Sequence, residues 1–311
     1  MEAAGKLAPE IYQAILDCLE DGVYLVDLDR KIAFWNRGAE QITGFRRQEV
    51  LGRSCEDQIL VHCRRGGDLL SAAECPLLRT LADGKIRSLD LFLRHRDGHC
   101  IPVRMRTAPV HDATGKLVGA AEIFEHSSQA SGRQSRGYQL GVHGCLDALT
   151  GAAGSAYART YLAEQLAEFE TYELPLAVLR ADIDGLGQVN RSRGREAGNA
   201  VLRMVARTLA DSLSDNGLVA RLEEDEFLVI LTNYGGETLQ DLAERSRVAV
   251  SLSAVPWWGD QFSVEVSIGA AAAEHGDTVE ALLARAGEML ARSKAQGGHR
   301  VTLSGKPAAG I

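Results

Sequence analysis

Residues 218–231 read LVARLEEDEFLVIL, a stretch that decides how the second half of the chain folds. The runs Leu218–Leu222 and Phe227–Leu231 are rich in residues that favour strands, and four acidic residues separate them. This pattern predicts a β-hairpin with a four-residue tip made of acidic side chains.

Helix and strand patterns alternate on both sides of this hairpin. A buried-type strand is predicted at 176–181, where it leads into Asp182-Ile183-Asp184, and another at 263–273. Apolar residues at helical spacing predict helices at 157–169, 201–213, 239–252 and 278–295. We therefore expect an α/β (α+β) domain at residues 147–305, with a mostly antiparallel central sheet flanked by helices.

The first part of the chain, residues 1–126, follows a different order. A helix is followed by two short strands, a helical middle and three further strands that are joined by two turns rich in Asp and Gly. Residues 127–146, rich in Ser, Gly, Gln and Arg, separate the two parts. They predict a flexible or irregular linker, because each glycine weakens a helix by about 1 kcal/mol relative to Ala.

Composition limits the classes of function. The 311 residues are 24% charged and 45% hydrophobic, with a formal net charge of -8, which argues against general affinity for nucleic acid or an anionic membrane. No stretch approaches the roughly 20 apolar residues of a membrane span, so we expect a cytoplasmic protein without membrane insertion. Its six cysteines contain no CxxC pair, so no disulfide framework is expected.

Three segments of the first part resemble the PAS sensory family. They are IAFWNRGAEQITGF at 32–45, EVLG at 49–52 and RHRDG at 94–98. The resemblance implies a five-stranded antiparallel sheet with helices, a domain that commonly dimerises, and a small ligand that the sequence does not identify.

Cysteine and histidine residues of this part leave alternatives open. Cys55 lies near the place where flavin-binding PAS domains keep a reactive cysteine, but the residues around it do not match their motif. His62, Cys63 and Cys75 would form a soft-ligand metal or redox site, or else a mixture of buried thiols and a surface imidazole.

Four segments of the second part resemble, in order, the GGDEF family of diguanylate cyclases. They are DALTG at 147–151, DIDGLGQVN at 182–190, RLEEDEF at 221–227, and VSIGA at 266–270 with KAQG at 294–297. In that family two GTP-loaded domains face each other, and the 3′-hydroxyl of each GTP attacks the α-phosphate of the other beside a divalent metal. The resemblance implies GTP or a related guanine nucleotide, Mg²⁺ and a homodimer.

The resemblance also assigns roles to individual residues. Metal would be held by Asp182, the Ile183 carbonyl and Asp225, which are hard oxygen ligands. Glu226 would lie beside the nucleophile if the enzyme is active, and Lys294 would contact phosphate. The nucleotide site would consist of Asn190, which reads guanine, with Asn199, Glu223, Glu224 and Lys294. The alternative for each residue taken singly is an exposed position at the end of a loop.

The chain departs most from the family at the hairpin, where Glu223 and Glu224 replace two glycines. Glycine lets the backbone turn sharply and approach phosphate, and glutamate opposes both requirements. A carboxylate within about 4 Å of a phosphate charge costs on the order of 4 kcal/mol at an effective dielectric near 20. That corresponds to roughly a thousandfold loss of affinity.

Other departures weaken the nucleotide site in the same direction. Asn199 replaces the guanine-reading Asp, which exchanges an acceptor-only carboxylate for an amide. Gly187 replaces a Lys, Leu186 replaces a Phe, and Gly298 replaces a phosphate-binding Arg. Two phosphate-binding cations are absent, and two anions are added.

Two functions fit this pattern. The first is a signalling protein in which a PAS sensor controls a catalytically impaired GGDEF-like domain that acts by nucleotide binding or through an unidentified effector protein. The alternative is an active diguanylate cyclase that converts two GTP to cyclic di-GMP with Mg²⁺. The departures favour the first.

Overall fold

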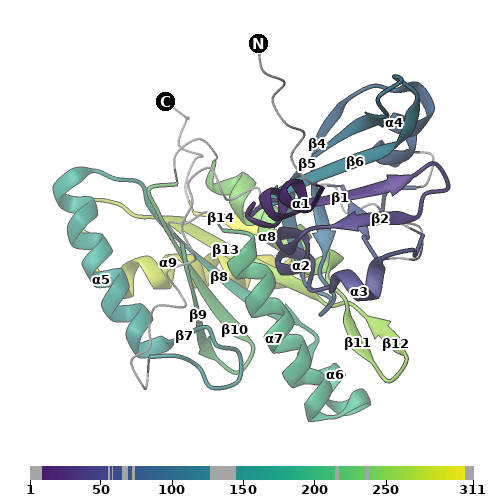
Figure 1. Cartoon of the computed structure of the whole chain (residues 1–311). Coiled ribbons are helices and arrows are strands. Elements are labelled where there is room, and N and C mark those ends of the chain that lie inside the picture. Colours follow the sequence, from purple (N-terminus) through teal and green to yellow (C-terminus); the bar gives the residue numbers. More distant parts are fainter. Residues whose placement is uncertain are drawn as a thin grey trace. The chain divides into compact units, whose positions relative to one another are not determined.

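The computed structural model describes residues 9–54, 57, 59–64, 69–71, 74–126, 145–213, 217–234 and 238–304. The chain divides into two compact units, one built mainly from residues up to 127 and the other mainly from those after it. Each unit has its own six-stranded sheet (Figure 1). Most of the predicted linker, residues 127–144, and Cys55 lie outside the described residues.

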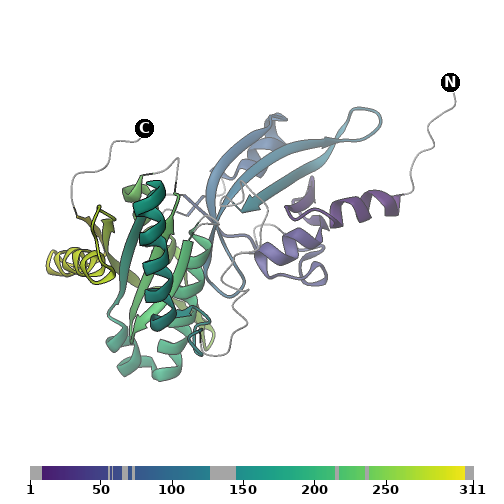
Figure 2. The same ribbon diagram turned by 90° about the vertical axis from the view of Figure 1, so that its left-hand side faces the viewer.

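The first unit is a curled sheet with short helices. Its strands are β1 (Gly22–Asp27), β2 (Ile32–Trp35), β3 (His62–Cys63), β4 (Arg87–Arg94), β5 (Cys100–His111) and β6 (Leu117–His126), in the order β2-β1-β6-β5-β4-β3. The five long strands confirm the predicted sheet, and the two-residue β3 extends it at one edge. β5 and β6 run antiparallel as a long twisted ribbon (Figure 2).

One buried side chain ties two helices of this unit, α1 and α2, to its sheet. The helices are α1 (Pro9–Asp17), α2 (Arg37–Thr43), α3 (Arg47–Val50) and α4 (Pro76–Asp83). Asn36, with no exposed surface, caps α2 by accepting from the Ala39 amide and also accepts from the Val23 amide, both at 2.8 Å. Its amide nitrogen donates to the carbonyls of Leu16 at 2.8 Å and Asp21 at 2.9 Å. A single side chain therefore satisfies four backbone groups.

Replacing Asn36 with Ala is expected to destabilise the first unit by about 3 kcal/mol, because it leaves several buried backbone groups without partners. Urea unfolding followed by circular dichroism measures the change. Gln41→Ala, an exposed substitution on the same helix, is the control and is expected to stay within about 0.5 kcal/mol. Equal midpoints for the two variants would contradict this account.

The second unit is an α/β domain around a mixed sheet. The strands are β7 (Ala153–Gly154), β8 (Leu176–Asp184), β9 (Gly217–Glu223), β10 (Glu226–Thr232), β13 (Glu265–Ala272) and β14 (Val301–Leu303), in the order β14-β13-β8-β10-β9-β7. The pairs among the four central strands are antiparallel, as predicted, and the short outer strands β7 and β14 pair in parallel. A separate hairpin joins β11 (Val255–Trp257) and β12 (Asp260–Phe262).

Helices cover both faces of this sheet (Figure 1). The apolar side of α5 (Ser155–Tyr172) and of α9 (Val279–Ala295) packs on one face, against alternate residues such as Val178 and Leu228. On the other face α7 (Arg195–Asp211) and α8 (Leu239–Leu252) pack against residues such as Leu179 and Val229. Successive side chains of each strand point to opposite faces of the sheet and therefore pack into two separate hydrophobic cores.

Helix α6 (Leu186–Arg193) was not among the predicted helices. Its sequence LGQVNRSR contains only two large apolar residues, so helical periodicity is too weak to reveal it. Within the described residues, no helix has the length and apolar character needed to cross a membrane.

Candidate functional site

The hairpin β9–β10 places its acidic residues beside the end of β8. Glu226 is paired with Asp182 across the sheet and with Glu223 across the hairpin. The tip therefore consists of Glu224 and Asp225 alone, and the predicted four-residue tip is wrong. The backbone pairing of β9 with β10 extends further than the apolar pattern suggested, because acidic side chains at the strand ends do not prevent backbone hydrogen bonds.

The backbone at the hairpin does not require glycine. Among the described residues, the non-glycine residues with positive φ are Arg30, Glu173, Asn233, Trp258 and His299, so neither Glu223 nor Glu224 adopts a left-handed conformation. The register shifts between Glu226 and Phe227, and this irregularity accommodates the tight turn. The expectation that glutamate opposes the turn is therefore wrong. What these residues still oppose is phosphate binding, because their carboxylates are negative and their side chains limit how closely a ligand approaches the backbone.

Two cations neutralise acids at the end of β8. Nζ of Lys294, from the last turn of α9, lies 2.6 Å from Oδ2 of Asp182. Arg180 forms a two-pronged ion pair with Glu226, in which Nε donates to Oε1 and Nη2 donates to Oε2 at 2.8 Å. Burial raises the pKa of the Asp182 carboxyl, the hydrogen bond from Lys294 opposes that rise, and the charge of Asp225 adds to it.

Arg180 was not among the predicted site residues. It interrupts the buried run of β8, and an arginine in such a run signals a buried counter-charge. Its Nη1 also donates to the carbonyl of Leu283 at 3.4 Å on α9. A Cβ at Gly287 would lie 2.5 Å from this Nη1, so the glycine provides the space that the guanidinium occupies.

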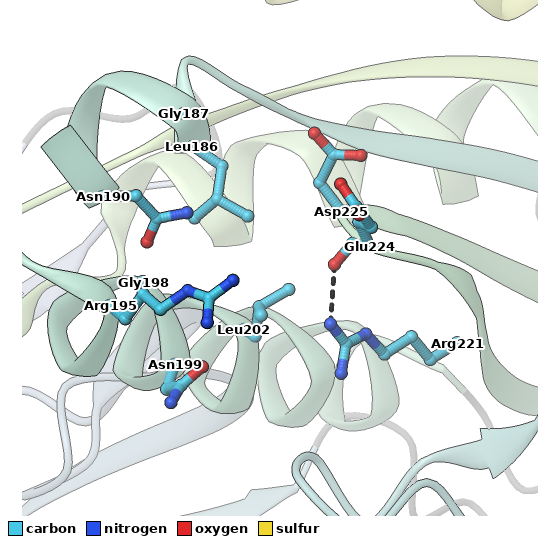
Figure 3. A pocket seen from close by; sticks show the side chains of 10 residues that line it. All are labelled: Leu186, Gly187, Asn190, Arg195, Gly198, Asn199, Leu202, Arg221, Glu224 and Asp225. Carbon is cyan, nitrogen blue, oxygen red and sulfur yellow. Dashed lines mark hydrogen bonds between the residues drawn. The ribbon is translucent and has the colours of Figure 1, made fainter.

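A pocket of about 380 Å³ opens beside the hairpin tip (Figure 3). Asn190 and Asn199, the predicted base-reading residues, line it from α6 and α7. A Cβ at Gly198 would lie 1.9 Å from Oδ1 of Asn190, so this glycine leaves room for the amide. The remaining lining residues come from both helices and from the hairpin: Leu186, Gly187, Arg195, Gly198, Leu202, Arg221, Glu224 and Asp225.

Charge in this pocket is mixed. The guanidinium groups of Arg195 and Arg221 extend into it from α7 and β9 (Figure 3). Nη2 of Arg221 donates to the carbonyl of Glu224 at 2.7 Å, and its Nη1 lies 3.3 Å from Oδ1 of Asp147. The pKa of Asp147 is lowered, since hydrogen bonds from Thr150 and the charge of Arg221 outweigh its partial burial. Arg195 and Arg221 are cationic groups that the sequence predictions did not include.

The predicted site residues thus fall into two neighbouring groups. Asn190, Asn199 and Glu224 line the pocket, whereas Asp182 and Lys294 meet beyond its lining. Asp225 lines the pocket and also contributes to the raised pKa of Asp182, so it connects the two groups. Its backbone oxygen accepts from the amide of Ile183 at 3.2 Å.

Glu223 and Gly298 stand apart from the pocket lining. Glu223 is exposed at the end of β9, and its side chain is not among the lining groups. Gly298 stands at the position of the missing phosphate-binding arginine and lies beside the Asp184 carboxylate. A Cβ added to Gly298 would lie 3.3 Å from each oxygen of that carboxylate.

The donor set at the end of β8 suits a hard divalent cation. Asp182 and Asp225 supply carboxylate oxygens, while Ile183 has a buried side chain and could contribute only through its backbone. The chemistry of these donors therefore fits Mg²⁺. Lys294 contacts one of them, the Asp182 carboxylate.

In the first unit a soft-ligand site, one of the two alternatives for His62, Cys63 and Cys75, is not assembled, and the surface imidazole of the other alternative is wrong because the His62 side chain is largely buried. His62 and Cys63 are successive residues of β3 and therefore project to opposite faces. Among the described residues, His62, Cys63 and Cys75 do not gather into a set that could hold a metal. Nε2 of His62 instead lies 3.3 Å from Oε1 of Glu122, whose side chain is fully buried.

The His62–Glu122 pair predicts a pH-dependent stability. Burial lowers the pKa of His62, but the Glu122 carboxylate beside it produces a net rise. A pKa raised on folding stabilises the folded unit below the unfolded-state pKa of 6.5, and this stabilisation is lost as pH increases through the folded-state pKa. The urea midpoint of the first unit is therefore expected to fall as pH rises from about 6 through the raised folded-state pKa of His62. His62→Gln is expected to flatten this dependence, and an unchanged slope would contradict the assignment.

Family models match both units. Residues 145–300 match the model described as diguanylate cyclase, GGDEF domain, and residues 20–126 match a PAS domain model. Among curated proteins, the chain is 25% identical over 266 residues to the cyclic di-GMP phosphodiesterase PdeB of Shewanella oneidensis. It is 27% identical over 258 residues to the probable diguanylate cyclase DgcE of Escherichia coli.

These similarities cover most of the chain but little of the relatives. Each alignment spans 82% of this chain, against 28% of PdeB and 22% of DgcE, so the chain spans about a quarter of their length. The GGDEF domain of DgcB from Caulobacter crescentus in complex with c-di-GMP is similar at a TM-score of 0.50 and 25% identity, covering 52% of this chain and 96% of that one. Diguanylate cyclase SiaD of Pseudomonas aeruginosa, in complex with its activator SiaC, gives a TM-score of 0.50 at 26% identity, over 54% and 64% of the two chains.

Proposed function

The chain belongs to the GGDEF diguanylate cyclase family and carries a PAS domain ahead of its GGDEF domain, and from this premise we propose that it is a sensory regulator with an impaired cyclase site. The PAS domain, residues 1–126, would receive a signal. The GGDEF domain, residues 147–305, would bind a guanine nucleotide without efficient turnover and act by that binding or through an effector protein.

The observation that carries this proposal is the state of the acidic residues. Glu226, the residue proposed to lie beside the nucleophile, is held in a two-pronged ion pair by Arg180. Asp182, a proposed metal ligand, is paired with Lys294. A carboxylate that is committed to an arginine is a poor base and a poor metal ligand, because both roles require its lone pairs. These ion pairs are thus compatible with nucleotide binding but unfavourable for cyclase turnover.

Glu224 adds a second argument against triphosphate chemistry. It lines the pocket at the place where the family resemblance implies phosphate contacts. The carboxylate is exposed, so solvent screens part of its repulsion. A nucleotide is therefore expected to bind through Asn190, Asn199 and the two arginines with reduced affinity.

Mg²⁺, if bound, would be held by Asp182, Asp225 and the Ile183 carbonyl and would neutralise phosphate charge. Asp225 is the acid best placed for this role, since it borders the pocket as well as the Asp182 group.

An active diguanylate cyclase is the second candidate, and one observation favours it. The hairpin keeps a tight two-residue tip without any left-handed residue, so the loop shape does not depend on the two missing glycines. On this alternative the enzyme would convert two GTP to cyclic di-GMP with Mg²⁺ bound.

Partners follow from the same family membership. Two GGDEF domains must face each other for the family reaction, and PAS domains commonly pair, so we propose a homodimer. The SiaD structure contains a cyclase with its activator protein, and by analogy an effector protein is proposed here.

Turnover separates the two candidates. Purified protein incubated with GTP and Mg²⁺ or Mn²⁺ is expected to form no more cyclic di-GMP than Asp182→Ala, because Glu226 is committed to Arg180 and Glu224 brings negative charge to the pocket. Chromatography of the products measures this. Clear turnover that Asp182→Ala abolishes would establish the cyclase and overturn the regulator.

Replacement of Glu224 by Gly is expected to raise GTP affinity roughly tenfold, since it removes a negative charge from the pocket lining. Glu223→Gly is the matched control, because Glu223 carries the same charge one residue away and does not line the pocket. Calorimetry with GTP at millimolar Mg²⁺ measures both. An equal effect of the two substitutions would show that only overall charge matters.

A further inference from the structure

Two cations contact the acids at the end of β8, and they are held in different ways. Arg180 makes two hydrogen bonds to Glu226 and a third to the Leu283 carbonyl, and its side chain is 26% exposed. Lys294 makes a single 2.6 Å contact with Asp182, and its side chain is 45% exposed. Arg180 is thus held by three hydrogen bonds to two partners, whereas Lys294 is held by one contact.

Chemistry reinforces this difference. A guanidinium in a two-pronged pair with a carboxylate is geometrically locked, while an ammonium on a four-carbon stem is a mobile point charge. Gly287 leaves space on α9 that the Arg180 guanidinium fills, so this group is built into the packing. Lys294 lies in the last turn of α9, where its stem can swing without disturbing the helix.

The acids therefore differ in their availability to a divalent cation. Glu226 is committed to Arg180, and Asp182 is paired with an exchangeable lysine. Asp225 makes no ion pair within the described part of the chain, and its backbone oxygen accepts from the amide of Ile183, the residue after Asp182, at 3.2 Å. A cation that approaches Asp182 and Asp225 must compete with Lys294 but not with Arg180.

We propose that the Lys294–Asp182 ion pair is an exchange contact: a divalent cation that binds Asp182 and Asp225 displaces Lys294, and the released ammonium group then binds a nucleotide phosphate. The first step depends only on this chain and the cation. The second rests on the proposed nucleotide binding.

The exchange couples two ligands through one side chain. While Lys294 is on Asp182, the metal site has one positive charge too many and the phosphate site has one too few. Each ligand relieves the obstacle to the other, so metal and nucleotide bind with positive coupling, and by linkage each raises the affinity of the other equally.

The first test uses Mn²⁺ alone, without nucleotide, titrated into the full chain while free Mn²⁺ is measured by electron paramagnetic resonance. Lys294→Met is expected to bind Mn²⁺ roughly tenfold more tightly than the unchanged protein, because the competing charge is gone. Arg292→Met is the matched control: it removes the same charge from an exposed residue of the same helical turn, and it should change affinity by less than about twofold. Asp182→Asn should abolish the site in both backgrounds.

The second test uses GTP with the metal removed by EDTA. Asp182→Asn frees Lys294 and is expected to tighten GTP binding severalfold. In a Lys294→Met background the same Asp182→Asn substitution should give no gain over Lys294→Met alone, whereas a gain that comes from reduced negative charge alone would persist.

The outcomes are distinct. Lys294→Met that binds Mn²⁺ no more tightly than Arg292→Met overturns the exchange, whatever happens with nucleotide. Failure of every variant to bind GTP, with the Mn²⁺ result as expected, overturns the proposed nucleotide function and the second step but keeps the exchange at Asp182. Circular dichroism checks each fold, and Lys294→Gln repeats the test if Lys294→Met is unstable.

Discussion

Antiparallel pairing of β8 with β10 brings Asp182 opposite Glu226, and the chemistry of the second unit depends on this register. Two carboxylates on adjacent strands repel each other unless cations lie between or beside them. Arg180, two residues earlier on the same face of β8, reaches Glu226, and Lys294 reaches Asp182 from α9. A slip of β10 by one residue would turn Glu226 to the opposite face of the sheet, where an apolar core lies, and away from Arg180.

The glutamates of the hairpin affect the charge of the site without changing the conformation of the turn. Loss of two glycines suggests a distorted loop, yet neither Glu223 nor Glu224 adopts a positive φ. What distinguishes them is position: Glu224 borders the pocket and Glu223 does not. The effect on nucleotide binding is therefore assigned to one charge and not to the shape of the turn.

Ion pairs in both units affect more than the free energy of unfolding at one pH. In the first unit His62 and Glu122 pair inside the domain and connect its stability to pH. In the second, the cations beside Asp182 and Glu226 decide which acids remain available. Both cases follow from the same rule, that a charge taken out of water must find a partner inside the protein.

The sequence by itself determined the order of elements, because periodicity and turn residues are local. It predicted α8, the central strands and the two-unit organisation, and motif spacing selected Asn190, Asn199, Asp182 and Asp225. It did not reveal α6, which has few apolar residues, or the two-residue hairpin tip, which depends on backbone pairing. Only the tertiary structure decided that Arg180 holds Glu226 and that Lys294 holds Asp182, because these partners are 46 and 112 positions apart and meet only when β10 and α9 pack against β8.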